Sequence, residues 1–146
     1  MNYLIKNKPI VFVNGTFDRL TVSHLELLDY ASECAAFFVE GKVVVAVDGD
    51  LRVKEKKGKD RPFFNCEERM YQLSRIKGVD QVYTFNSDKE LEELIKELNP
   101  ELMIVGSDWE GRKVIGSEYA KKLEFFERDE RYSSTKILNY EKNLCI

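Results

Sequence analysis

Residues 10–24 of the chain read IVFVNGTFDRLTVSH. They begin with an almost continuous apolar run, which is typical of a strand in a parallel sheet that is covered on both faces. Gly15 and Thr16 predict a turn directly after this strand. A helix is predicted to begin near residues 21–24, where residues 23–26 (SHLE) fit the S-x-x-E capping box. A strand, a tight turn and a helix start in this order are typical of the first part of a βαβ unit, so the stretch predicts an α/β fold.

Similar runs rich in apolar and β-branched residues follow this first one. The five predicted strands lie at residues 10–14, 42–47, 81–85, 101–105 and 123–126. Apolar residues at helical spacing lie between them, at Leu25, Leu28, Ala31 and Ala35, at Met70, Leu73 and Ile76, and at Leu91, Leu94, Ile95 and Leu98. The alternation predicts an α/β, Rossmann-like doubly wound sheet of five parallel strands with helices on both faces, whose ligands bind beyond the carboxyl ends of the strands.

The composition indicates an ordinary globular protein. The 146 residues include 23 Lys and Arg and 26 Asp and Glu, which gives a formal net charge of −3. No repeat, low-complexity tract or linker interrupts the sequence, so residues 1–146 are predicted to form a single domain. The mild acidity argues against a nucleic-acid partner, because phosphate backbones are bound by basic surfaces.

Cysteine and histidine usage bounds the chemistry and the compartment. Cys34, Cys66 and Cys145 are an odd number without a CxxC pair, which argues against a disulfide framework and a zinc site. His24 is the only histidine, so a histidine cluster is excluded and no protein ligand for a metal is predicted. The start of the chain lacks a secretory signal pattern, and no apolar run reaches membrane-spanning length. We expect a cytoplasmic protein without a membrane partner.

His24 falls in the first turn of the first predicted helix. Free backbone N–H groups and the positive end of the helix dipole favour a bound phosphate there, and a histidine adds a hydrogen bond or a charge. On its own, a histidine in a first turn is solvated surface more often than a catalyst. Its place directly after the first strand of an α/β sheet, where anion sites recur, favours the functional interpretation.

A second candidate segment follows the second predicted strand. Residues 52–61 (RVKEKKGKDR) carry six basic and two acidic side chains, so their local charge is +4. Taken alone, such a charge run predicts a solvated loop. Because it lies beyond the second strand and beside the first motif, it also predicts a loop that closes over a phosphate-containing ligand and neutralises its charge.

Aromatic residues divide into two groups. Six phenylalanines occur as adjacent pairs at residues 37–38, 63–64 and 125–126, and we expect them to pack in the core. Trp109 follows the fourth predicted strand. Its position beyond this strand predicts either a contact with the bound ligand or a place in a subunit interface.

Residues 15–24 (GTFDRLTVSH) resemble the GTFDxxHxGH signature of the cytidylyltransferase-like nucleotidyltransferases. This superfamily transfers a nucleoside monophosphate from an NTP to a phosphate monoester. Thr21 and Ser23 replace the first histidine and the glycine of the signature, and phosphopantetheine adenylyltransferases also have threonine at the first of these positions. The second histidine is present as His24. The resemblance implies an enzyme that takes Mg²⁺ with its NTP substrate and forms a homodimer.

The resemblance also implies roles for individual residues. The implied catalytic residues are His24, Thr21, Lys54, Lys57 and Arg128. The implied nucleotide-binding residues are Gly15, Thr16, Phe17, Asp18, Ser23, His24, Gly106, Asp108, Trp109, Ser133, Ser134 and Thr135. Asp48 and Arg61 are implied to bind the acceptor. Read without the family, Asp18 is a turn residue that orients the backbone, and residues 133–135 are good helix caps.

Two segments favour different substrates. Residues 108–111 (DWEG) look most like the glycerol-3-phosphate cytidylyltransferases, whereas residues 114–118 (VIGSE) look more like the heptose-phosphate adenylyltransferases. The leading hypothesis is therefore a transfer from CTP to glycerol 3-phosphate that yields CDP-glycerol. The second is a transfer from ATP to a sugar 1-phosphate, and the third is a nucleotide-binding protein of the same fold without catalysis.

Overall fold

The computed structural model describes residues 5–127 of the chain. Its strands are β1 (Ile10–Gly15), β2 (Lys42–Asp48), β3 (Gln81–Phe85), β4 (Leu102–Gly106) and β5 (Leu123–Phe126). Its helices are α1 (Val22–Ala35), α2 (Asp50–Lys57), α3 (Cys66–Ser74) and α4 (Asp88–Leu98), with the short 3₁₀ helices η1 (Ser107–Trp109) and η2 (Ser117–Tyr119). All five predicted strands are present within one residue of their predicted bounds.

The five strands form one parallel sheet in the order β3-β2-β1-β4-β5. The chain runs outward from the central strand β1 to β2 and β3, then returns to β4 on the other side of β1 and continues to β5 at that edge of the sheet. The direction of winding therefore reverses between β1 and β4. The connections diverge at such a switch point and leave a crevice beyond the carboxyl ends of the strands.

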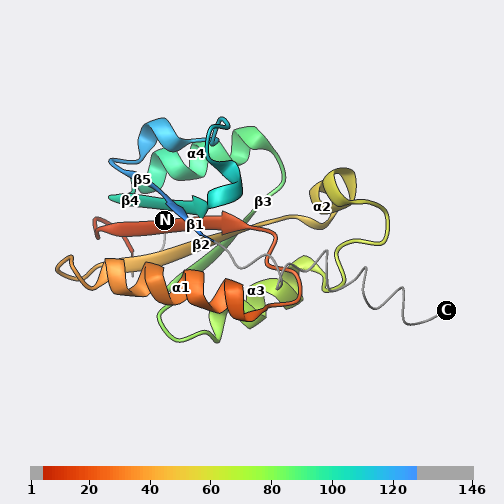
Figure 1. Ribbon diagram of the computed structural model, residues 1–146, viewed down its shortest axis with the longest axis horizontal. Coiled ribbons are helices and arrows are strands. Elements are labelled where there is room, and N and C mark those ends of the chain that lie inside the picture. Colours follow the sequence, from red (N-terminus) through yellow and green to blue (C-terminus); the bar gives the residue numbers. More distant parts are fainter. Residues whose placement is uncertain (1–4, 128–146) are drawn as a thin grey trace.

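Helices cover both faces of the sheet, as the sequence predicts (Figure 1). Side chains of successive strand residues point to opposite faces. In β1, Val11 and Val13 pack with α1 and α3, whereas Ile10 and Phe12 pack with α4. Each face of β1 is thus dry, which explains why its sequence shows no polar alternation. Within residues 5–127, no helix is long and apolar enough to cross a membrane.

The prediction for the paired phenylalanines is wrong in part. Phe37 is 89% exposed and Phe63 is 60% exposed, whereas Phe38 packs against the core beside α1. Adjacent residues point in different directions, so a turn that buries one member of a pair turns the other outward. The Phe63 ring instead lies under the Arg19 guanidinium, whose central carbon is 4.8 Å from the ring centre.

The predicted loop after β2 is also wrong in part, because residues 50–57 form helix α2. Asp50 lies in its first turn and three lysines lie in its last turn, which is the arrangement that favours a helix dipole. Lys and Glu are good helix formers. Only Val53 gives the helix a buried apolar side chain, so α2 depends on polar contacts for its position beyond the strand ends (Figure 1).

Arg69 of α3 provides one of these contacts and is fully buried, with 0% exposure. Its Nη2 donates to Asp50 Oδ1 in α2 at 2.9 Å, and its Nη1 donates to the carbonyl oxygen of Thr16 at 2.9 Å. Its Nε donates to the carbonyl oxygen of Phe64 at 3.0 Å. One guanidinium thus joins α2, the turn after β1 and the segment before α3.

We expect Arg69→Ala to lower the free energy of unfolding by about 3 kcal/mol or more, because it leaves a cavity and buried carbonyl groups without donors. Urea unfolding followed by circular dichroism measures the loss. Arg75→Ala is the matched control, since Arg75 is exposed and stacks on the exposed Tyr71, and it should change the free energy by less than about 0.5 kcal/mol. Equal effects of the two substitutions would contradict the role given to Arg69.

Candidate functional site

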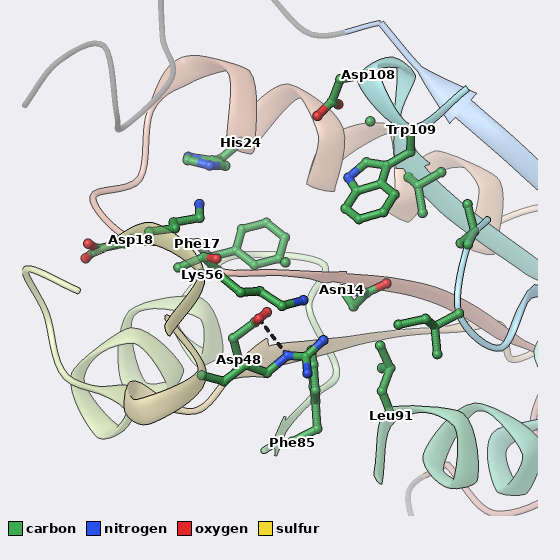
Figure 2. A pocket seen from close by; sticks show the side chains of 18 of the residues that line it. Asn14, Phe17, Asp18, His24, Asp48, Lys56, Phe85, Leu91, Asp108 and Trp109 are labelled. Atoms are coloured by element: carbon green, nitrogen blue, oxygen red, sulfur yellow. Dashed lines mark hydrogen bonds and ion pairs between the residues drawn. The ribbon is translucent and has the colours of Figure 1, made fainter. Parts of the chain in front are cut away.

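A pocket of about 380 Å³ lies beyond the carboxyl ends of the strands, where the fold predicts a ligand site. Many of the sequence-predicted site residues line it. They are Gly15, Thr16, Phe17, Asp18, His24, Asp48, Lys57, Arg61, Gly106, Asp108 and Trp109. Figure 2 shows side chains from β1, α1, α2 and η1 around the same space. The topology therefore gathers residues that are up to 94 positions apart in the sequence, from Gly15 to Trp109.

Helix α1 begins within the predicted residues 21–24, but its capping box differs from the prediction. Its N-cap is Thr21 rather than Ser23, and His24 occupies the third helical position. His24 Nδ1 accepts a hydrogen bond from the Thr21 backbone N–H at 3.0 Å. The imidazole thus takes the place that Glu or Gln has in an ordinary capping box. Because Nδ1 is the acceptor, the neutral ring carries its proton on Nε2.

Ser23 does not line the pocket, although the resemblance implies a nucleotide contact. Its side chain is 1% exposed, and its Oγ has no hydrogen-bond partner in the part of the chain that the structure describes. Thr21 is also absent from the lining. The second helical position points into the fold, whereas the third points toward the strand ends, and this is why His24 reaches the pocket.

The turn between β1 and α1 is held in an uncommon backbone conformation. Phe17 and Arg19 have φ angles of 51° and 59°, a left-handed region that side chains with a Cβ rarely adopt. The Phe17 ring is buried against His24, with 5.5 Å between ring centres. A Cβ at Gly15 would lie 3.1 Å from the Phe17 ring. Glycine therefore allows Phe17 to fold back under the strand end and support the histidine.

Asp18 fixes the turn to the segment that precedes α3. Its Oδ2 accepts a hydrogen bond from the Phe63 N–H at 2.7 Å, and its Oδ1 accepts one from the Phe64 N–H at 3.0 Å. The Arg61 Nε lies 3.5 Å from Asp18 Oδ2. Asp18 is 1% exposed, so its carboxylate is used within the fold to hold Arg61 at the pocket wall.

Arg52 connects α2 to two other elements. Its Nε donates to Asp48 Oδ2 at the end of β2 at 3.1 Å, the contact dashed in Figure 2. Its Nη2 donates to Asp88 Oδ1 in the first turn of α4 at 2.5 Å. This hydrogen bond is the main reason why the pKa of Asp88 is lowered from its ordinary value. Arg52 and Asp48 thus place a cation and a carboxylate side by side in the pocket wall.

The lysines of α2 do not all face the pocket. Lys56 and Lys57 line it, whereas Lys54, which the resemblance implies to be catalytic, does not. Because α2 is a helix with 3.6 residues per turn, Lys56 shares the face of Arg52 four positions earlier, and Lys54 points to the other side. This difference between the lysines arises because the segment is a helix and not the loop that the sequence predicts.

Several lining residues were not predicted. They are Asn14, Leu27, Arg52, Lys56, Phe85, Leu91, Val105, Val114 and Ile115. Asn14, Phe85 and Val105 lie at or next to the carboxyl ends of their strands, and this placement is a signal that the sequence contains. Leu91 and Val114 have no such signal, because their pattern is that of core residues. Arg128, Ser133, Ser134 and Thr135 lie outside the described residues.

No group of three or more His, Cys, Asp or Glu side chains between residues 5 and 127 is arranged to hold a metal ion. Two carboxylates of the pocket wall, Asp18 and Asp48, are each paired with an arginine. The described residues therefore do not form a metal cage of their own.

Comparison with known proteins gives a consistent result. A family model described as cytidylyltransferase-like matches residues 12–140. The chain is 36% identical over 133 residues to the bifunctional protein HldE of a Nitratiruptor species. The aligned region covers 91% of this chain and 28% of that protein. The chain is also 31% identical over 141 residues to the bifunctional protein HldE of Helicobacter pylori. That aligned region covers 97% of this chain and 29% of that protein. The chain thus spans less than a third of the length of these relatives.

A solved structure supports the fold. The lipopolysaccharide core biosynthesis protein from Thermoplasma volcanium superposes with a TM-score of 0.66 at 20% sequence identity. The match covers 83% of this chain and 98% of that one. At this level of identity the likeness concerns the arrangement of the strands and helices alone.

We expect Asp18→Asn to lower the free energy of unfolding by about 1–3 kcal/mol, because the amide keeps only one of two acceptor oxygens and loses the charge that faces Arg61. Urea unfolding measures the change. Asp108→Asn makes the same substitution at an exposed pocket residue and should change the free energy by less than about 0.5 kcal/mol. An unchanged stability of Asp18→Asn would show that the segment before α3 is held by other contacts.

Proposed function

The chain belongs to the cytidylyltransferase-like family, and on that basis we propose that it transfers a nucleoside monophosphate from an NTP to a phosphate monoester and releases pyrophosphate. One observation of the site carries the proposal. His24 in the first turn of α1, Lys57 of α2 and Arg61 line one pocket beyond the ends of parallel strands. Positive groups and a helix N-terminus that converge in this way suit a polyphosphate.

The matches to HldE support the adenylyltransferase hypothesis at least as well as the leading hypothesis of a glycerol-3-phosphate cytidylyltransferase. We therefore propose ATP as the nucleotide and a sugar 1-phosphate of the heptose-phosphate type as the acceptor. The resemblance of residues 114–118 to heptose-phosphate adenylyltransferases points the same way, and Val114 and Ile115 of this segment line the pocket.

CTP with glycerol 3-phosphate remains the second candidate because of residues 108–111 (DWEG). Asp108 and Trp109 of this segment line the pocket, and the Arg112 guanidinium lies 5.9 Å from the centre of the Trp109 ring. Trp109 is 41% exposed, so its ring face is accessible to a base. Both candidates share one reaction type and differ in the base and the acceptor.

The chemistry is a substitution at the α-phosphorus of the NTP. A phosphate oxygen of the acceptor forms a new P–O bond, and the bond between the α-phosphorus and the bridging oxygen to the β-phosphate breaks. The bonding electrons leave with pyrophosphate, and no covalent intermediate with the protein is needed. Negative charge grows on the equatorial and leaving oxygens, so fixed hydrogen-bond donors and cations accelerate the step.

The proposal gives each described residue a physical task. His24 presents Nε2–H as a donor, because Thr21 fixes Nδ1 as the acceptor. Lys57 and Arg61 contribute positive charge, and Asp18 keeps Arg61 in position. Mg²⁺ enters with the NTP, whose phosphate oxygens are the ligands that this ion prefers. Arg128 and residues 133–135 are proposed to complete the phosphate contacts, and the homodimer remains a prediction.

The first test is a panel of reactions with the purified protein and Mg²⁺. Each of the four NTPs is combined with glucose 1-phosphate, a heptose 1-phosphate or glycerol 3-phosphate, and pyrophosphate release is measured. We expect release with ATP and a sugar 1-phosphate. Release with CTP and glycerol 3-phosphate alone would establish the second candidate, and NTP binding without release across the panel would favour the non-catalytic binding protein.

His24 allows the catalytic and structural tasks to be separated. We expect His24→Ala to lower the turnover number by about 10²- to 10³-fold through loss of a transition-state donor, and to lose about 1 kcal/mol of stability with the cap. His24→Gln is the matched variant, because Gln at the third helical position also accepts from the N-cap N–H.

We expect His24→Gln to unfold at nearly the wild-type temperature and still to be severely impaired in pyrophosphate release. Thermal unfolding and steady-state kinetics of the two variants measure this. Wild-type turnover in His24→Gln would remove the imidazole from the chemical step.

A further inference from the structure

Asn14, near the end of the central strand β1, carries a polar group that the fold leaves unsatisfied. Its Oδ1 is buried and has no hydrogen-bond partner in the part of the chain that the structure describes. The residue lines the pocket, and in the view of Figure 2 its side chain lies between Asp48 and Trp109. A buried amide without a partner typically destabilises a protein by about 1–3 kcal/mol. A group that binds in the pocket is the natural partner for it.

The neighbours of Asn14 show which part of the pocket it faces. Even-numbered residues of β1 and β2, such as Phe12 and Ala46, pack with α4, and Asn14 and Asp48 continue these rows. Phe85, Leu91 and Val114 belong to the same α4 side and line the pocket there. Helix α1, which carries His24 in its first turn, packs on the opposite face of the sheet. The pocket therefore straddles the edge of the sheet.

Polar groups on the α4 side are few and mostly paired with each other. Asp48 and Arg52 form an ion pair at 3.1 Å, and Arg52 also reaches Asp88. The surrounding walls of Phe85, Leu91 and Val114 are apolar. Among the described residues on this side of the pocket, Asn14 is thus the uncharged polar side chain that can still form a hydrogen bond with a ligand.

The chemistry of the amide defines its partner. Oδ1 requires a donor, which an ionised phosphate does not have, so a phosphate alone cannot satisfy it. A hydroxyl group both donates and accepts, and it therefore pairs with the amide whichever way the oxygen and nitrogen are placed. A hydroxyl group of the ligand is therefore a suitable partner for Asn14 on the α4 side.

We propose that Asn14 reads a hydroxyl group of the acceptor and so selects a hydroxylated phosphate monoester over one with a plain alkyl chain. The identification of this ligand as the acceptor rests on the proposed function. The α1 side, with His24 and the helix N-terminus, takes the reacting phosphates. The α4 side, with Asp48 at the end of β2, takes the carbon skeleton that carries the accepting phosphate.

Two variants of the same shape provide the test. Asn14→Val removes the amide, and Asn14→Thr differs from it by a hydroxyl group in place of a methyl group. Affinities for glycerol 3-phosphate, glucose 1-phosphate and n-propyl phosphate are measured by calorimetry, and thermal unfolding is measured without ligand. Acceptor and NTP KM values are measured wherever the wild type turns over.

We expect the wild type to bind the hydroxylated probes roughly five- to tenfold more tightly than n-propyl phosphate, the effect of about one hydrogen bond. Asn14→Val should lose this preference and Asn14→Thr should recover part of it. The unfolding temperature of Asn14→Val should be unchanged or higher, because an unpaired buried polar atom is removed. The KM for the acceptor should rise while that for the NTP stays constant.

Three results would overturn the inference: a wild type that binds n-propyl phosphate as well as the hydroxylated probes, an Asn14→Val protein that unfolds several degrees earlier, or a KM change confined to the NTP. The first two do not depend on catalysis. A wild type that binds hydroxylated probes selectively through Asn14 but releases no pyrophosphate would instead contradict the proposed function and leave the Asn14 contact standing.

Discussion

Helices cover the parallel sheet on both faces, and this constraint determines where the site lies. Strands such as β1 and β2 are dry on each side, so their polar side chains occur where the strands end. The carboxyl ends of parallel strands meet at one edge, and Asn14 and Asp48 meet there for this reason. The reversal of strand order between β1 and β4 leaves room beside them. The position of the pocket thus follows from the topology of the sheet, whichever side chains line it.

Two buried ionic groups then fix the polar segments that surround this edge. Arg69 joins the turn after β1 to α2, and Asp18 joins the same turn to the segment that carries Arg61. Neither side chain is accessible enough to serve mainly as a ligand-binding group, since both are at most 1% exposed. They position the groups that face the pocket. Buried charges of this kind require complete hydrogen bonding, and each makes at least two such bonds.

The sequence predicts the sheet well and the local details of the site less well, for physical reasons. Dry strands give uninterrupted apolar runs, so all five strands were predictable. Helix α2 was missed because charge at its ends, rather than an apolar face, supports it. The start of α1 near residues 21–24 is predicted correctly, but its capping box is not, because Thr21 and Ser23 are both good caps and a histidine in the role of Glu has no sequence signal. Lys56 is not predicted because the helix that orients it is not predicted, and Asn14 is predicted as the last residue of its strand, a position that by itself does not indicate a role in the site.

The cap that His24 closes at the start of α1 affects how divergence in this family is interpreted. A histidine that closes the cap of α1 contributes to folding whether or not the protein catalyses a reaction. A descendant that loses activity therefore still has a physical reason to keep it. Lys56 is exposed, and among residues 5–127 its charge acts on the Asp88 carboxylate, where it adds to the Arg52 hydrogen bond in lowering the pKa, rather than closing a helix cap. Substitution of Lys56 is therefore a more informative sign than substitution of His24 of whether a related chain still binds a charged substrate.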